Sequence, residues 1–393
     1  MEKIYIVAAQ RTPIGKFNGS LATLTAVQLG TTVIKDVLAK SGLAAGQVDQ
    51  VLMGNVIQAG SGQNPARQAS MAAGLGQAVP AITINDVCAS GLSSINLAAS
   101  LIQSGQAQVI IAGGMESMTN APYVLKKARG GYRFGDGTLI DAMQEDALKD
   151  VYGGYPMGIT AENINERYHV TRQQQDDFAL ASHQKAVRAQ ETAAFDPEIT
   201  PVPVIDRHGS HVVDQDEAPR PDTSMAALAK LKPAFKQDGT VTAGNASGIN
   251  DGAAAVALAS ATAVEEYGLT PLAEWDGASL VGIDPAVMGL GPYYAIKKLF
   301  ETTGLSTADV DLYEINEAFA TQALVCQDWL HLDPAKVNPR GGAIALGHPV
   351  GCSGARILVT LVHEMQDLDR QTGIASLCVG GGMGIAALVR RDE

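Results

Sequence analysis

Aromatic and basic residues are both scarce in this chain. Phe, Trp and Tyr make up 5% of the 393 residues, and 28 Lys and Arg stand against 41 Asp and Glu, a formal net charge of −13. Nucleic acids and anionic membranes select basic surfaces, so this balance argues against both as partners. A few local cations can still hold an anionic small ligand. With 46% hydrophobic residues, the chain is long enough for two or three domains around a large core.

Cysteine spacings typical of metal sites are missing as well. Cys88, Cys326, Cys352 and Cys378 form no CxxC pair and lie near no pair of histidines, which argues against a zinc site. Unpatterned free cysteines fit a reducing compartment. We see neither a basic leader followed by an apolar stretch nor an apolar run of membrane-spanning length. The expectation is therefore a cytoplasmic protein with no signal peptide.

One of these cysteines lies between a predicted strand and a predicted helix. The β-branched run 81–84 indicates a strand, and apolar residues recur at helical spacing from Leu92 to Ile102, before Ser104-Gly105 ends the helix. Cys88 then stands at a helix N-terminus, where free N–H groups favour a thiolate. This position predicts a nucleophile. The alternative is a small buried hydrophobic residue.

Two similar α/β halves are indicated by repeated spacings. Gly42-Leu43 with Val48-Asp49 matches Gly304-Leu305 with Val310-Asp311, at an offset of 262 positions (304 − 42). The apolar run 109–112 predicts a strand that ends in Gly113-Gly114, and the pattern of an apolar run, glycines and then methionine at 109–115 recurs at 375–383. The predicted helix after Cys88 has a counterpart in the apolar periodicity from Ile357 to Met365. Two repeats in the same order predict an internal duplication.

Between these halves the sequence becomes charged and rich in proline. Thr171-Arg172-Gln173-Gln174 is a capping box that opens a helix running to about Glu191. We interpret 120–245 as a domain inserted into the first half, a usual place for substrate-binding loops, although its charged helix could equally be a solvated face. The expected division is 1–119 for the N-terminal half, completed by about 246–270, then 120–245 for the insertion and 271–393 for the C-terminal half.

Three further stretches combine glycine with a chemically useful side chain. His348 lies before Pro349 in the glycine-rich loop 341–351, a setting that suits a general base near neutral pH. Cys378 ends an apolar strand just before three glycines, whose N–H groups can face an oxyanion. Asn316 at the end of another strand could orient a water or simply form a turn.

Together these stretches resemble the signatures of the thiolase family, in the family's order and from Ile4 to the C-terminus. The motifs are Asn85-x-x-Cys88-x-Ser90-Gly91, Gly113-Gly114-Met115-Glu116-Ser117-Met118, Asn316-Glu317-Ala318-Phe319, Gly347-His348-Pro349 and Cys378-x-Gly380-Gly381-Gly382-x-Gly384. Within the family, the stretches 131–137 and 242–248 resemble the biosynthetic, acetoacetyl-CoA-forming branch. The resemblance implies an α/β thiolase fold, with two βαβαβαββ halves in five αβαβα layers and an inserted loop domain that binds coenzyme A. It also implies a homodimer, paired into a homotetramer through the stretch from Tyr123 to Asp141.

The activity implied is the reversible Claisen condensation of two acetyl-CoA molecules to acetoacetyl-CoA and CoA, within lipid metabolism such as the mevalonate pathway. Cys88 would carry the acetyl group and His348 would be its base. Cys378 would take the methyl proton of the second acetyl-CoA. His348 and a water on Asn316 would hold the enolate oxygen, and the N–H groups of Cys88 and Gly380 the tetrahedral intermediates. No metal or redox cofactor is required.

The resemblance also carries over a coenzyme A site. Its residues here are Leu148, Met157, Arg220, Phe235, Ala243, Ser247, Ala318 and Phe319. Two positions depart from the family pattern: Pro156 stands where short-chain members usually have histidine, and Ala227 where a serine is usual. The first affects the polarity of the acyl pocket and the second a polar contact to coenzyme A.

Three other functions compete with this one. A degradative 3-ketoacyl-CoA thiolase of broader chain length differs in substrate range. A ketoacyl synthase shares the fold and the cysteine nucleophile, but it lacks a cysteine at the place of Cys378. A catalytically silent coenzyme A or lipid-binding protein would not need Cys88, His348 and Cys378 together.

Overall fold

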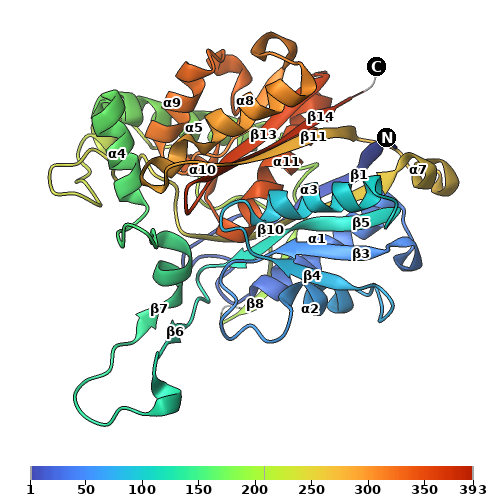
Figure 1. The fold of residues 1–393 in the computed structure, drawn as a ribbon, viewed down its shortest axis with the longest axis horizontal. Coiled ribbons are helices and arrows are strands. Elements are labelled where there is room, and N and C mark those ends of the chain that lie inside the picture. Colours follow the sequence, from blue (N-terminus) through green and yellow to red (C-terminus); the bar gives the residue numbers. More distant parts are fainter. Residues whose placement is uncertain (1, 208, 392–393) are drawn as a thin grey trace.

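A long mixed sheet, built from two half-sheets, runs through the molecule in the computed structural model, which describes residues 2–207 and 209–391 (Figure 1). The strands follow the order β12-β13-β14-β11-β1-β10-β5-β3-β4, and the short β2 pairs with β10. Their bounds are β1 Ile4–Arg11, β2 Gly15–Lys16, β3 Gln50–Gly54, β4 Ala81–Ile84, β5 Val109–Ser117, β10 Asn250–Ser260, β11 Ala273–Gly282, β12 Leu312–Ile315, β13 Thr372–Val379 and β14 Met383–Arg390. The half-sheets join where β1 pairs with β11 over three residue pairs, Ile4 with Trp275 to Ile6 with Ala273.

Helices form three layers around these half-sheets. Helices α1 (Ala26–Ser41) and α2 (Pro65–Ala72) pack on the outer face of the first half-sheet, through a buried cluster that includes Val33 and Val51. Helix α8 (Gly291–Thr303) packs on the outer face of the second, with α9 (Ala320–Trp329) beside it. Helices α3 (Ser90–Gln103) and α11 (Val350–Asp367) lie between the two half-sheets and share one core with both. These five layers are the expected thiolase arrangement.

The chain order in the first half is β1-α1-β3-α2-β4-α3-β5-β10, as expected, with the insertion between β5 and β10. At the position in the second half that corresponds to β4, the described chain forms a single bridge, between Tyr313 and Val337, in place of a strand. The Asn338 side chain makes the hydrogen bonds that a strand backbone would make to β12. Its Oδ1 accepts from Ile315 N at 2.8 Å and its Nδ2 donates to Ile315 O at 2.9 Å. Asn338 itself has a positive φ of 44°, which ends the extended backbone.

The region between β5 and β10 holds an extended arm and several helices. The arm carries the hairpin of β6 (Tyr123–Val124) and β7 (Ile140–Asp141) and projects away from the body (Figure 1). The longest helix is α5 (Arg172–Glu191), and the capping box expected at its start is present, with Thr171 and Gln174 capping each other. The other elements are η3 Gln144–Leu148, α4 Gly158–Tyr168, β8 Val202–Asp206, β9 Gly209–Val213 and α6 Met225–Leu228.

Short elements complete the fold. They are η1 Ala45–Gln47, η2 Ala128–Gly130, α7 Ala261–Tyr267, η4 Pro285–Leu290, η5 Thr307–Asp309, η6 Pro334–Lys336 and α10 Ala343–Leu346. In the described part of the chain, no helix combines the length and the apolar character needed to cross a membrane. The proposed domain boundaries stay a prediction.

Candidate active site

Cys88 lies in the turn between β4 and α3, as the sequence predicts. The turn is closed by Ala89 N donating to Asp86 O and Ser90 N donating to Val87 O. Val87, directly before the cysteine, has a φ of +46°. A β-branched residue rarely adopts this conformation, which costs on the order of 1–3 kcal/mol. The surrounding packing therefore forces the backbone into the shape that presents Cys88.

The protonation state of Cys88 differs from the sequence-based expectation. Burial raises the pKa of the Cys88 thiol to about 11, and the hydrogen bond from the Gly380 backbone opposes this rise. The helix N-terminus does not compensate for the lost solvation, so the resting group is a thiol. A nucleophile in this state needs a base that takes its proton as it attacks. The bond to Gly380 also brings the predicted oxyanion residue next to the predicted nucleophile.

His348 has the properties of that base. Burial, and then the charge of Arg356, lower the pKa of His348 to about 4, so the imidazole is neutral near pH 7. Its Nδ1 lies 2.5 Å from Ser353 Oγ, and that hydroxyl also donates to Pro349 O at 2.9 Å. A hydroxyl has one proton to give, so it accepts from Nδ1–H. The lone pair of His348 is then on Nε2.

Helices α3 and α11 pack closely against each other near their N-termini, where the loops of Cys88 and His348 end. A Cβ added to Gly91, at the start of α3, would lie 2.7 Å from Ala355 N of α11. A Cβ added to Gly354 of α11 would lie 2.6 Å from Leu92 N of α3. Only glycine permits this approach of the two backbones. Loops far apart in sequence are thereby brought to one place.

Cys378 lies at the end of β13 and is fully buried. Its Sγ donates to Gln322 Oε1 at 3.5 Å. Burial, followed by the charge of Cys88, raises the pKa of Cys378 well above its usual value. The structure thus brings Cys378 within electrostatic range of Cys88. Once deprotonated, such a thiolate is a strong base.

Asn316 follows β12, and its buried side chain has no hydrogen-bond partner among the described residues at either Nδ2 or Oδ1. Buried polar atoms in proteins are nearly always satisfied by protein groups or by an ordered water. The orphaned amide fits the expectation that Asn316 holds a water. The backbone after it is fixed by Ser247 N donating to Ala318 O at 3.0 Å.

A wall of apolar side chains surrounds Cys378. Phe235 and Phe319 meet edge to face at 6.2 Å between ring centroids, and both belong with Met157 and Ala318 to the cluster that contains Cys378. Gly380 faces the same wall, since a Cβ there would lie 2.9 Å from Met157 Cε and 3.0 Å from Val87 Cγ1. Four predicted substrate residues therefore gather around Cys378, one of the two predicted catalytic cysteines.

The other predicted coenzyme A residues lie farther along the insertion. Leu148 packs on the core cluster that contains Cys88, and its carbonyl accepts from Met157 N at 2.9 Å. Ser247 is half-buried, and Ala243 and Arg220 are exposed. The Arg220 backbone N–H donates to His183 Nδ1 at 3.2 Å. Its exposed guanidinium can meet an anionic group at the surface.

Sequence reasoning missed several residues that touch the site. Ser353 Oγ contacts the His348 imidazole, and Asn250 Oδ1 accepts from the His348 backbone N–H. Gln322 Oε1 accepts from the Cys378 thiol. A serine five positions after the histidine, at a helix start, is a signal that could have been read. Asn250 and Gln322 lie far from their partners in sequence and carried no such signal.

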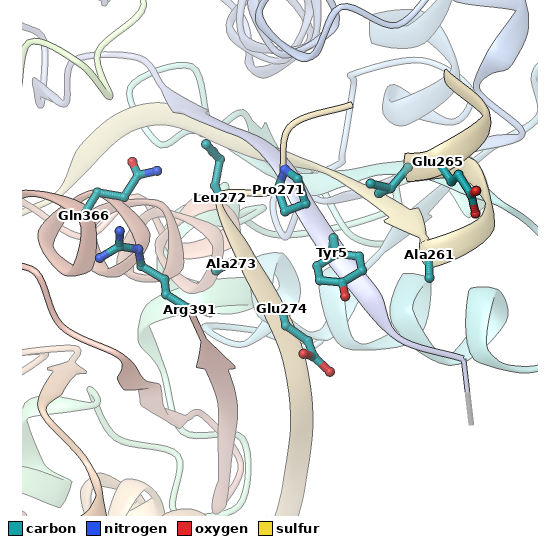
Figure 2. Close-up of a pocket in the computed structure, with 10 residues that line it drawn as sticks. Tyr5, Ala261, Glu265, Pro271, Leu272, Ala273, Glu274, Gln366 and Arg391 are labelled. Carbon is teal, nitrogen blue, oxygen red and sulfur yellow. The ribbon is translucent and has the colours of Figure 1, made fainter. Parts of the chain in front are cut away.

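A surface cleft of about 410 Å³ lies elsewhere, beside α7 (Figure 2). Its lining includes Tyr5, Glu274 and Arg391 but no cysteine or histidine. β14 begins at Met383, next to the loop that follows Cys378, and ends at Arg390, beside this cleft. Its eight residues separate the cleft from Cys378 by roughly 23 Å along the strand. The cleft is therefore remote from the predicted chemistry.

Comparisons with known proteins agree with this arrangement. The family model described as "Thiolase, N-terminal domain" matches residues 4–262, and "Thiolase, C-terminal domain" matches residues 269–391. An acetyl-CoA acetyltransferase of Pseudomonas aeruginosa is 53% identical over 393 residues, covering 100% of both chains. The crystal structure of the Bacillus anthracis acetyl-CoA acetyltransferase superposes with a TM-score of 0.97 at 45% identity, covering 99% of each chain. That of human mitochondrial 3-ketoacyl-CoA thiolase gives 0.96 at 41% identity, covering 100% of this chain and 99% of the other.

Proposed function

The chain belongs to the thiolase family, and on that premise we propose that it is an acyltransferase that joins two acetyl-CoA molecules into acetoacetyl-CoA and CoA, reversibly. The observation that supports this most is that two buried cysteines, Cys88 and Cys378, lie within electrostatic range of each other, with an apolar cluster around Cys378. Condensation needs an acyl carrier and a separate base for a weak carbon acid, and two thiols can divide these tasks.

In the first half of the reaction, Cys88 Sγ attacks the thioester carbon of acetyl-CoA while His348 Nε2 takes the thiol proton. The N–H groups of Cys88 and Gly380 receive the developing oxyanion, and each such donor is worth about 3 kcal/mol. The C–S bond to coenzyme A breaks, and Cys378 gives its proton to the leaving thiolate. Acetyl-Cys88 and a Cys378 thiolate remain.

In the second half, the Cys378 thiolate takes a methyl proton from the second acetyl-CoA. The raised pKa of Cys378 makes this thiolate strongly basic, which suits a weak carbon acid. His348 and a water on Asn316 stabilise the enolate oxygen. The enolate carbon attacks acetyl-Cys88, and the Cys88 sulfur leaves and recovers its proton from His348. These residues supply every proton and nucleophile, so the proposed reaction needs no metal or redox cofactor.

Coenzyme A would bind across the insertion, with the acyl and pantetheine end at Met157 and Phe319 and the nucleotide end at Arg220. The exposure of Arg220 and the apolar cluster around Phe319 support this orientation. Pro156 and Ala227 are both exposed. Neither replaces a group that reacts.

We further propose a cytoplasmic homodimer, paired into a homotetramer, that acts in lipid metabolism such as the mevalonate pathway. Four free cysteines support a reducing compartment. The apolar residues exposed on the β6–β7 arm support the tetramer, because Phe134 is fully exposed and Tyr123 is 64% exposed.

The test is incubation with acetyl-CoA alone, followed by mass mapping of the added acetyl group. We expect the label on Cys88. Cys378→Ala should retain part of the acetyl transfer and lose carbon–carbon bond formation. Equal loss of both would contradict the division of roles between the cysteines.

A degradative 3-ketoacyl-CoA thiolase is the second candidate, since the human mitochondrial enzyme of that name is closely similar in structure. Thiolysis rates along a series of 3-ketoacyl-CoA chain lengths separate the two. We expect the rate to fall steeply beyond acetoacetyl-CoA, and comparable rates on long chains would favour the degradative function.

A further inference from the structure

One buried carboxylate, Glu116 near the end of β5, links the loop of His348 to the turn that supports Cys88. Its side chain is 0% exposed. Oε2 accepts from Gly351 N at 2.9 Å and from Val56 N at 3.0 Å. Oε1 accepts from Asn55 Nδ2 at 2.7 Å and from Ile57 N at 3.2 Å. Four donors thus converge on two oxygens.

The donors come from two loops, one that carries His348 and one that supports the turn of Cys88. Gly351 lies three residues after His348, at the start of α11. The 55–57 turn follows β3 and supports the nucleophile, because Asn55 N donates to Ile84 O at 2.9 Å and Asn85 Nδ2 to Val56 O at 3.4 Å. Val56 and Ile57 also share a core cluster with Cys88. A single side chain therefore connects two loops that must keep a fixed spacing.

Only an ionised carboxylate matches this set of donors. Its two oxygens offer about four lone-pair directions, whereas glutamine offers one oxygen and an NH₂ group that would face N–H donors. Burial opposes the ionised form and raises the pKa of Glu116 to about 7, while the backbone N–H groups act in the other direction. The four hydrogen bonds therefore stabilise the ionised form against the cost of burial.

We propose that Glu116 is a positioning residue, whose carboxylate sets the spacing between the Cys88 turn and the His348 loop. Glu116 touches neither of these two side chains, so it acts through Gly351 and Val56. This inference rests on the proposed function, because the spacing matters only if His348 takes the proton of Cys88.

The test is Glu116→Gln in the full-length protein. Wild type and variant are mixed with acetyl-CoA, the rate of acetyl-Cys88 formation in a single turnover is measured by mass spectrometry, and coenzyme A affinity is measured by calorimetry. We expect acetylation to slow 10- to 100-fold while the affinity for coenzyme A stays within twofold. A merely structural role would lower rate and affinity together.

Asp49→Asn is the matched control. Asp49 Oδ2 also accepts from two backbone N–H groups, those of Gln108 at 2.6 Å and Val109 at 2.9 Å, at the opposite end of β5. The rate at which the Asp49→Asn variant forms acetyl-Cys88 should stay within twofold of the wild-type rate. Asn55→Ala removes one donor and keeps the carboxylate, so it decides the matter if Glu116→Gln does not fold, and it should slow acetylation threefold or more.

The role of Glu116 is overturned if the acetylation rate of Glu116→Gln stays within threefold of the wild-type rate. It is also overturned if the affinity for coenzyme A falls in parallel with the acetylation rate. If Glu116→Gln does not fold, a loss of less than threefold in Asn55→Ala overturns it. Failure of the wild type to acetylate Cys88 is a different result, because it overturns the proposed function itself.

Discussion

At the scale of single residues, the site depends on groups held away from water. Cys88, His348 and Cys378 are each buried, and burial is the largest influence on the pKa of each. Burial keeps both thiols protonated and the imidazole neutral. The resting site therefore contains no ion pair among these three side chains near pH 7.

The neutral imidazole has a consequence for the acid limb of the pH profile. Because the pKa of His348 is lowered from 6.5 to about 4, its base form persists on acidification well below pH 6.5 and is lost only as the pH falls through about 4. We expect kcat/KM to stay level from pH 7 to about 5, and to fall tenfold per pH unit below about 4. Steady-state thiolysis after short pH jumps measures this. An inflection near 6.5 would show that the histidine titrates as if exposed.

Ser353 is expected to fix which nitrogen of His348 carries the proton. Ser353→Ala removes the acceptor for Nδ1–H, so the ring can rotate or change tautomer. A hydrogen bond of this kind is worth about 1.5 kcal/mol, so the turnover rate should fall roughly tenfold. The same assay on Ser279→Ala is the control, since the buried Ser279 hydroxyl on β11 donates to Ala295 O of α8 at 2.6 Å and contacts none of the proposed catalytic residues. Equal losses in both variants would refute a specific role.

The positions of the proposed catalytic residues carry the clearest local signals in the sequence. Cys88, His348 and Cys378 stand beside glycines or at strand ends, and these local patterns are visible in sequence. The sign of the pKa shift at Cys88 was not predictable, because it depends on how completely the two helices and the second half-sheet cover the thiol. The contacts of Asn250 and Gln322 could not be predicted either, since each joins segments that only the fold brings together.

At the scale of elements, close backbone contacts explain where the prediction and the structure differ. The apolar run at 109–112 was expected to end in Gly113-Gly114, yet β5 continues to Ser117. Gly113 lies against Ala254 and Ala255 of β10, and Gly114 against Gly351 of α11, so a side chain at either place would collide. These glycines permit packing inside the strand and do not mark its end. Likewise α11 begins at Val350, seven residues before the apolar periodicity that indicated it.

The crossing of α3 and α11 predicts the effect of Gly91→Ala. The new Cβ would meet the Ala355 backbone, which cannot move without displacing α11. Overpacking of this kind costs about 1–3 kcal/mol of stability. Because both catalytic loops lead into these helices, we expect the turnover rate of the protein that remains folded to fall by about two orders of magnitude. Thermal unfolding and steady-state turnover are both measured.

Gly46→Ala serves as the control for that substitution. A Cβ on Gly46 would meet nothing within 4 Å. Its unfolding midpoint and turnover rate should match wild type. An unchanged turnover rate in Gly91→Ala would mean that the helix crossing does not set the spacing of the two loops.

At the scale of the whole molecule, the duplicated halves have different uses. Of the proposed catalytic residues, the first half supplies Cys88 and the second supplies His348, Asn316 and Cys378, so the proposed site lies where the two halves meet. The insertion contributes Met157 and Phe235 to the same place. The repeated spacings were enough to predict two halves, but the joining of the two half-sheets through β1 and β11 requires pairing between residues about 270 positions apart and has no local signature.

The arm between β5 and η3 gives the last prediction, about assembly. Apolar side chains as exposed as Tyr123, Phe134 and Leu139 are costly in water, and here they lie on one projecting arm (Figure 1). A second copy of the arm is the proposed cover. Phe134→Ser combined with Tyr123→Ser should shift the protein from tetramer to dimer in sedimentation velocity, while the turnover rate per chain changes less than twofold, since the arm contributes none of the proposed catalytic residues. A variant that remains tetrameric would place the dimer–dimer contact elsewhere, and one that becomes monomeric would assign the arm to the dimer interface instead.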